Sequence, residues 1–172
     1  MFHNLKLLYS WLIKLLMFWL PDQNHIMRIR GKLYSLAMPC NPKNFQVSST
    51  ATIKNLENLQ VGNNVYLAPG SIINAIDNVI LGDEVMIAFN SVVNSGNHTM
   101  HNGSYRFGDS NKKPIQIGKG SWIAANCTVV AGTVIGKGCL IAANSVAKGS
   151  CLDYGVYSGV PIKLVRLIDK FK

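Results

Sequence analysis

From Ile117 onward, an aliphatic residue recurs at every sixth position of the chain. An α-helix repeats every 3.6 residues and a β-strand every two, so neither element alone gives a period of six. The successive hexads read IGKGSW, IAANCT, VVAGTV, IGKGCL, IAANSV and AKGSCL. The same register appears upstream, at Val61, Leu67 and Ile73 and again at Leu81, Ile87 and Val93.

This period predicts a parallel β-helix, in which one aliphatic residue of each hexad points into a narrow core. Three hexads make one triangular coil, so residues 117–150 supply nearly two coils and residues 61–96 about two more. The eight-residue step from Ile73 to Leu81 predicts a small bulge in one coil. Gly or Asn is expected where the chain turns between strands. The predicted corner residues are Asn64, Gly70, Asn90, Gly120, Asn126, Gly132, Gly138 and Asn144.

The first 20 residues are the most apolar stretch, and a polar residue interrupts them at every fourth position. Lys6, Ser10 and Lys14 would form a narrow polar stripe on a helix beside a broad apolar face. The two lysines disfavour a transmembrane span, and the absence of a small-residue cleavage site before Pro21 disfavours a secretory signal. We expect a helix lying in an interface, and a protein that stays in the cytoplasm.

A second amphipathic pattern follows Pro21. Ile26, Ile29, Leu33 and Leu36 recur at helical spacing, with Arg28, Arg30 and Lys32 between them. Residues 1–43 hold six Lys or Arg and one acidic residue. Such a pair of helices fits peripheral association of residues 1–38 with the anionic inner face of the cell membrane. It equally fits two helices that pack on the main domain or on another subunit.

Length and composition indicate one domain with appendages. The chain has 172 residues, of which 48% are hydrophobic and only 15% charged, so a disordered chain is excluded and much of the surface must be stacked or covered. We expect a helical segment over residues 1–43 and a β-helix over residues 44–160, interrupted by a loop at residues 97–113. A short helix is expected over residues 161–172.

The chain carries a formal net charge of +9, which favours an anionic partner. Nucleic acid is not expected, because aromatic residues do not interleave with the basic ones in the repeat and no nucleic-acid motif appears. The four cysteines show neither a C-x-x-C pair nor a Cys/His zinc spacing. We therefore expect free thiols in a reducing compartment and no metal.

Three motifs lie in the last third of the repeat: P-I-x-I-G-x-x-x-W-I at 114–123, G-T-V-I-G at 132–136 and G-V-P-I-K at 159–163. With them, residues 59–168 resemble the hexapeptide-repeat acyltransferases, and most of all the branch of galactoside, maltose and surface-polysaccharide O-acetyltransferases. This resemblance implies a left-handed coil, a homotrimer and acetyl-CoA as co-substrate.

Acetyl transfer to a hydroxyl needs a general base and an oxyanion donor. His98 and His101 open the long loop, where catalytic groups commonly sit. The resemblance implies that His98 is the base, at a groove between adjacent subunits, in a direct transfer without an acyl-enzyme. His101 is the second candidate. No Asp or Glu adjoins His98, so a backbone carbonyl is expected to orient it.

The resemblance also implies where coenzyme A binds. Ala125 and Ala143, one coil apart, would let the pantetheine lie against the backbone. Residues near the nucleotide end would be Ala147, Lys148, Lys163 and Arg166, of which the three cations suit phosphates.

The acceptor side departs from the galactoside branch, because the positions that would hold the sugar read Ala68 and Ala75-Ile76. Simple galactosides and maltose are therefore not expected as acceptors. Asn74, Asp77 and Arg106 are the candidates for a different acceptor pocket.

The sequence thus predicts an acetyl-CoA-dependent O-acetyltransferase that modifies a sugar hydroxyl of a surface polysaccharide or its precursor. Two alternatives stay open. One is N-acetylation of a nucleotide-linked amino sugar, and the other is a non-catalytic β-helix scaffold, which would need neither the long loop nor His98.

Overall fold

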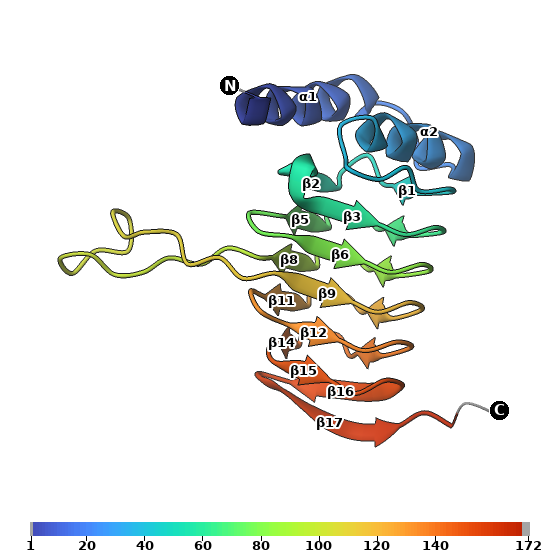
Figure 1. Ribbon diagram of the computed structural model, residues 1–172. Helices are drawn as coiled ribbons and strands as arrows, with labels where there is room; N and C mark the ends of the chain where they lie inside the picture. Colours follow the sequence, from blue (N-terminus) through green and yellow to red (C-terminus); the bar gives the residue numbers. More distant parts are fainter. Residues whose placement is uncertain (1, 170–172) are drawn as a thin grey trace.

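The computed structural model describes residues 2–169, which form a solenoid of stacked coils with two helices at its N-terminal end (Figure 1). Each coil contributes one short strand to each of three sheets, and strands of successive coils pair in parallel. The predicted parallel β-helix is confirmed.

The three sheets are the three faces of the solenoid. The first contains β1 (Gln46–Val47), β4 (Tyr66–Leu67), β7 (Met86–Ile87), β10 (Trp122–Ile123), β13 (Leu140–Ile141), β16 (Gly155–Gly159) and β17 (Ile162–Leu167). The second contains β2 (Thr52–Lys54), β5 (Ile72–Asn74), β8 (Val92–Asn94), β11 (Thr128–Val130) and β14 (Val146–Ala147). The third contains β3 (Leu59–Val61), β6 (Val79–Leu81), β9 (Ile115–Ile117), β12 (Val134–Ile135) and β15 (Ser150–Cys151).

The aliphatic hexad positions form the core. Ile117, Ile123, Val129, Ile135 and Ile141 are all buried, and the upstream hexad positions join the same cluster. The predicted corners are confirmed as well, because all eight Asn and Gly residues have φ between 56° and 82°. This left-handed backbone region is accessible to Gly and, at a lower cost than for other residues, to Asn.

The coils before the loop are longer than those after it. Gln46 pairs with Tyr66, twenty positions on, whereas Trp122 pairs with Leu140, eighteen positions on. The extra residues lie at the corner between the second and third sheets, as the step from Ile73 to Leu81 predicted. One more coil, which the hexad pattern did not predict, precedes Val61. A 3-10 turn (Leu56–Asn58) occupies its enlarged corner. The long loop leaves the solenoid at this same corner, between β8 and β9.

Helices α1 (Phe2–Met17) and α2 (Asn24–Ser35) lie across the open N-terminal end of the solenoid (Figure 1). Ile13 and Tyr34 enter the core cluster of the coils. Gly31 is required where α2 crosses the chain, because a Cβ there would lie 2.0 Å from the carbonyl oxygen of Phe45. The helices therefore cap the core and shield the end of the first coil from water.

Arg30 corrects one expectation about this segment. It was predicted as part of a basic surface with Arg28 and Lys32, yet it is 1% exposed. Its guanidinium donates to the carbonyl of Val47 at 2.6 Å and lies 3.1 Å from Asp22 Oδ1. It also donates to the carbonyls of Met17 and Leu20, each at 3.2 Å. Arg30 joins the two helices to the first coil because its planar fork satisfies several carbonyls at once.

The C-terminal helix expected over residues 161–172 is wrong as far as the described residues reach. Residues 162–167 form β17, which runs antiparallel to β16. The last parallel strand would otherwise leave a row of backbone N–H and C=O groups unpaired, and the hairpin satisfies them.

Candidate functional site

Residues 97–113 form an arm that projects far from the solenoid (Figure 1). Its two limbs pair with each other. The N–H of Thr99 donates to the carbonyl of Asp109 at 3.0 Å, and the N–H of Asn111 donates to the carbonyl of Asn97 at 2.9 Å. Gly108 allows this pairing, because a Cβ there would lie 1.6 Å from the carbonyl oxygen of Thr99. The arm is therefore held mainly by its own backbone.

The end of the arm is a tight turn. His101 and Ser104 exchange two backbone hydrogen bonds, of 3.0 and 2.9 Å, around Asn102 and Gly103. Both central residues have positive φ, of 47° and 76°. An Asn-Gly pair favours such a two-residue hairpin turn because both residues tolerate the left-handed region.

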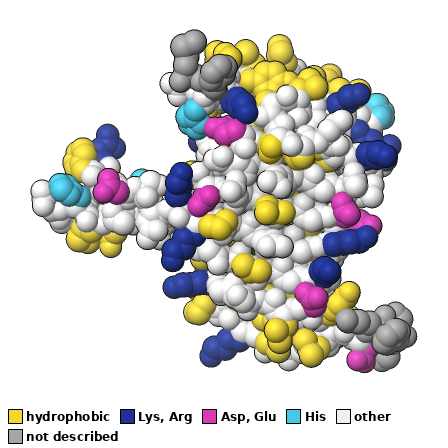
Figure 2. Space-filling model, viewed as in Figure 1, with side chains coloured by type: hydrophobic (Ala, Val, Ile, Leu, Met, Phe, Trp, Pro, Cys, Tyr) yellow, Lys and Arg dark blue, Asp and Glu magenta, His cyan; other side chains and the backbone are white. Residues whose placement is uncertain are grey.

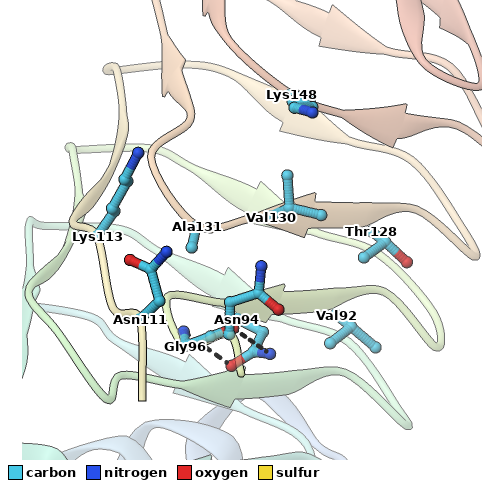
Figure 3. Close-up of a pocket in the computed structure, with 10 residues that line it drawn as sticks. Val92, Asn94, Gly96, Asn111, Lys113, Thr128, Val130, Ala131 and Lys148 are labelled. Carbon is cyan, nitrogen blue, oxygen red and sulfur yellow. Dashed lines mark hydrogen bonds between the residues drawn. The ribbon is translucent and has the colours of Figure 1, made fainter. Parts of the chain in front are cut away.

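A cleft of about 510 Å³ opens where the arm meets the second sheet (Figure 3). One wall is the outer surface of β8 and β11, and the other is the base of the arm. Its lining residues are Val92, Asn94, Gly96, Asn97, Asn111, Lys113, Thr128, Val130, Ala131 and Lys148. Two lysines beside several amides make this a positively charged, hydrogen-bonding cleft.

A ladder of asparagines fixes the polar floor of the cleft. Asn55 donates to Asn74, and Asn74 donates to the Oδ1 of Asn94, each through Nδ2 at 3.0 Å. Asn94 in turn donates to the carbonyl of Gly96 at 3.0 Å and accepts from its N–H at 3.2 Å. The Asn94 amide is therefore held in one orientation where the arm begins.

The two candidate histidines lie at different distances along the arm. His98 is exposed and directly follows Asn97 of the cleft lining, and its N–H donates to Asn97 Oδ1 at 2.9 Å. His101 belongs to the turn at the end of the arm, where its Nε2 lies 3.2 Å from Asn102 Nδ2. Neither histidine lines the cleft, but His98 is bonded to a lining residue along the chain, whereas His101 lies at the far end of the arm.

The residues proposed for coenzyme A occupy two edges of the second sheet. Ala125 and Ala143 stack at the corner where this sheet begins, and the N–H of Asn144 donates to the carbonyl of Ala125 at 3.0 Å. Lys163 reaches the same corner, because it pairs with Ser158 and the next residue, Gly159, donates to Ser145 Oγ at 3.1 Å. These positions form one column along the solenoid.

The other proposed cofactor residues are less close together. Lys148 lines the cleft at the far edge of the second sheet. The side chain of Ala147 is buried in the core, so only its backbone is available to a ligand. Arg166 pairs with Val156, three residues along β17 from Lys163, which is about 10 Å at the rise of a strand.

The three acceptor candidates do not form one pocket within the chain. Asn74 bonds to Asn94 of the cleft, and the N–H of Asp77 donates to Ser95 Oγ at 2.9 Å near the base of the arm. Arg106 lies far out on the arm, with its guanidinium 5.8 Å from the centre of the Phe107 ring.

Lys113, Asn94 and Asn111 line the cleft but were not selected from the sequence. Two signals pointed to them. Asn74 and Asn94 are one twenty-residue coil apart, and Lys113 directly precedes the motif that starts at Pro114.

Three of the four free cysteines are buried in the solenoid. Burial raises the pKa of the Cys127 and Cys139 thiols. Burial, with a smaller effect of Cys139, raises the pKa of Cys151 to about 11. These three thiols stay protonated near neutral pH, and a protonated thiol is a poor nucleophile. Within residues 2–169, no three His, Cys, Asp or Glu side chains gather in a way that would hold a metal ion.

Residues 114–149 match the sequence family described as bacterial transferase hexapeptide (six repeats). The chain is 35% identical over 82 residues to the putative lipopolysaccharide biosynthesis O-acetyl transferase WbbJ of Escherichia coli K12, covering 40% of this chain and 42% of that protein. It is 38% identical over 55 residues to the probable acetyltransferase Rv3034c of Mycobacterium tuberculosis H37Rv, covering 32% of this chain and 18% of that protein. The chain thus spans less than half the length of either relative. The resemblance to hexapeptide-repeat acetyltransferases is confirmed.

Solved structures share the fold along nearly the whole chain. A galactoside acetyltransferase in complex with coenzyme A superposes with a TM-score of 0.81 at 21% identity, covering 96% of this chain and 82% of that one. A maltose O-acetyltransferase from Clostridium difficile 630 gives 0.78 at 22% identity, covering 97% and 88%. The N-acyltransferase AntD from Bacillus cereus, in complex with dTDP and coenzyme A, gives 0.65 at 17% identity, covering 75% and 83%. Because superposition preserves handedness, the chain coils in the same sense as these structures.

Proposed function

We propose that this protein is an acetyl-CoA-dependent O-acetyltransferase that acts in the cytoplasm on a sugar hydroxyl of a surface polysaccharide or its precursor. The observation that carries the proposal is the cleft at the base of the arm, lined by two lysines and several amides, with His98 as the residue that follows Asn97 of this lining. The similarity to WbbJ, named for lipopolysaccharide O-acetyl transfer, supports the type of acceptor.

In the proposed reaction, the neutral imidazole of His98 accepts the proton of the acceptor hydroxyl while its oxygen attacks the thioester carbonyl. The new C–O bond forms as the C–S bond breaks, and the leaving thiolate takes up a proton from the imidazolium. A backbone N–H would stabilise the oxyanion. The raised pKa values of the buried thiols support a direct transfer, since they leave Cys127, Cys139 and Cys151 without a thiolate.

Acetyl-CoA, the proposed co-substrate, supplies the activated acetyl group and carries phosphates. The column of Ala125, Ala143 and Lys163 offers small side chains followed by a cation, and Lys148 adds a second cation at the cleft. Small residues allow a pantetheine chain to approach the backbone, and the lysines suit phosphate groups. Arg166 would contact the cofactor further along β17.

We also propose that the chain acts as a homotrimer, with each arm packed against a neighbouring subunit. Met100, Tyr105 and Phe107 are exposed on the arm, and Phe107 is 73% exposed. Large apolar side chains on a projecting segment favour burial against another surface. In that arrangement Arg106 of one subunit would reach an acceptor bound at the cleft of its neighbour. It would then lie near Asn74 and Asp77 of that neighbour.

N-acetylation of a nucleotide-linked amino sugar is the second candidate. The fold is shared with AntD, which is named as an N-acyltransferase and was solved with dTDP and coenzyme A. An amine is already a nucleophile once it is deprotonated, so the same cleft and base would serve this reaction.

The test is an incubation of the full chain with acetyl-CoA and two panels, polysaccharides and nucleotide-linked amino sugars, with mass spectrometry of the products. We expect an added acetyl group on a hydroxyl of a polysaccharide. An acetyl group added to the amine of a nucleotide-linked amino sugar would favour the alternative. His98→Ala should lower kcat about 100-fold or more with little change in acetyl-CoA binding, while His101→Ala, the matched control, should cost far less. A reversed order would make His101 the base. No effect of either substitution would refute the proposed mechanism.

A further inference from the structure

Helix α1 presents its apolar side to solvent. Figure 2 shows hydrophobic side chains gathered at the top of the molecule, where Figure 1 places α1. Among them, Leu16 is 72% exposed and Trp19, just beyond the helix, is 82% exposed. The exposed apolar residues of this surface, which we call the α1 face, are Leu5, Leu8, Trp11, Leu12, Leu15, Leu16, Phe18, Trp19 and Leu20.

The polar stripe of α1 points the other way, toward the solenoid. Ser10 Oγ donates to the carbonyl of Ile53, and Lys14 Nζ donates to Thr52 Oγ1 at 2.6 Å. His3 Nδ1 lies 2.5 Å from Glu57 Oε1. Helices on a protein surface ordinarily turn most of their apolar side chains toward the core. On α1, Ile13 does so, but the polar stripe shares this side and many of the other apolar residues face solvent. These bonds hold the α1 face outward, so its exposure is built into the fold.

A groove of about 470 Å³ runs between α1 and the end of α2 on this surface. Leu5, Leu8, Leu12, Leu36 and Ala37 line it, together with Tyr9 and, as the one charged residue, Lys6. Its walls are almost wholly apolar, so it suits a hydrocarbon chain.

The helical end of the molecule is positively charged. Arg28 and Lys32 are exposed on α2, where they line a separate pocket with residues 41–45 of the first coil, whereas Asp22 is the sole acidic residue before Glu57 and already bonds to Arg30 and Ser48. A second copy of the same surface would bring like charges together, whereas an anionic lipid surface would attract them. Trp and Phe beside the apolar residues suit the boundary between headgroups and hydrocarbon.

We propose that the α1 face docks this protein on an anionic lipid bilayer, with α1 lying in the plane of the headgroups. The sixteen residues of α1 span about 24 Å at the rise of an α-helix, less than the roughly 30 Å of a hydrocarbon core. Across residues 2–169, no helix has both the length and the hydropathy to cross a membrane. In this arrangement the solenoid extends from the bilayer into solution, and the cleft lies several coils from the lipid surface. This property is separate from the proposed acetyl transfer.

The test is co-sedimentation of the full chain with phosphatidylcholine vesicles, with and without phosphatidylglycerol, at low and high salt. We expect binding that is strongest with phosphatidylglycerol at low salt. Leu16→Gln with Trp19→Gln should weaken binding about tenfold or more, since it removes apolar burial. Arg28→Glu with Lys32→Glu should weaken binding by a similar factor to anionic vesicles only. In a Trp122→Phe background, the fluorescence of Trp11 and Trp19 should shift to the blue on binding.

Matched controls come from exposed residues elsewhere on the solenoid. Leu152→Gln with Val165→Gln removes two exposed apolar residues at the opposite end, and Lys119→Glu with Lys137→Glu reverses two charges on the corners of the coils. Both controls should bind as the unmodified chain does. The proposal is overturned if the full chain stays in the supernatant under all conditions, or if control and α1-face variants bind alike. Analytical ultracentrifugation that shows a smaller oligomer for the α1-face variants, without vesicle binding, would assign the surface to a second copy.

Discussion

The arm and the helical cap are both additions to the same repeat, but they join it in different ways. The cap places Ile13 and Tyr34 in the core and anchors itself through the buried Arg30. The arm bonds mainly to itself, and its apolar residues, such as Phe107, stay exposed. The cap therefore belongs to the folding unit, whereas the arm is carried by a solenoid that does not depend on it.

The arm is the part of this fold that can vary without disturbing the core. A rigid coil tolerates a long insertion at a corner because closing a loop costs little more as the loop lengthens. The inserted segment is then free to carry groups such as His98 without disturbing the core. The cap has no such freedom on its inner side, so only its outer surface is available for a further role.

Removal of the arm should have the greatest effect on activity. Replacing residues 98–110 with Asn-Gly would join Asn97 to Asn111 by a two-residue turn, across the 2.9 Å bond that already links their backbones. We expect acetyl transfer to fall about a thousandfold, while the solenoid of each subunit still folds. Activity assays and calorimetry measure the two effects, and failure of the shortened chain to fold would show that the arm is part of the folding unit.

The corresponding change in the cap is Arg30→Ala. It leaves the carbonyls of Val47, Met17 and Leu20 without their donor and should lower the free energy of unfolding by about 3 kcal/mol. Arg28→Ala on the exposed side of the same helix is the control, with an expected change within about 0.5 kcal/mol. Denaturant unfolding measures both, and equal losses would contradict the assigned role of Arg30.

Acid should weaken the cap through Asp22. Burial alone would raise the pKa of Asp22, but hydrogen bonds from Ser48 and Ser49 and the charge of Arg30 outweigh it and lower the pKa below its usual value. A carboxyl with a lowered folded pKa stabilises the fold above its unfolded pKa, near 4, and this contribution disappears as the pH falls through the folded value. Asp22→Asn should cost about 1 kcal/mol at pH 7 and remove part of the loss of stability below pH 4. Unfolding curves at several pH values test this, and an unchanged pH profile would count against it.

The smallest expected effect concerns the solenoid side of the cleft. Lys148→Ala should raise KM for acetyl-CoA about fivefold, roughly 1 kcal/mol, and leave KM for the acceptor nearly unchanged. Single Ala substitutions of Lys163 and Arg166 should act in the same direction. Lys137→Ala, at a corner between the third and first sheets, is the control and should change neither constant. A larger rise in KM for the acceptor than for acetyl-CoA would assign these basic residues to acceptor binding.

The sequence determined the repeat because each coil obeys the same local rule. An inward aliphatic residue and a corner residue in the left-handed region recur with a short period. This period alone predicts that Ile117 is buried and that Asn126 lies at a corner. The arm showed itself as the interruption of that period, and His98 as the histidine at its start. The Asn-Gly pair in the arm is likewise a local signal for the turn that forms there.

The side that each helix turns toward the core depends on contacts with the first coil. The spacing of Lys6, Ser10 and Lys14 revealed a stripe, but the first coil provides carbonyl and hydroxyl partners that draw this stripe inward and leave the apolar residues outside. Arg30 became a buried anchor for the same reason, and residues 162–167 became a strand because β16 offered an open edge. These outcomes depend on partners distant in the sequence, whereas periodicity reports only the order of residues along one element.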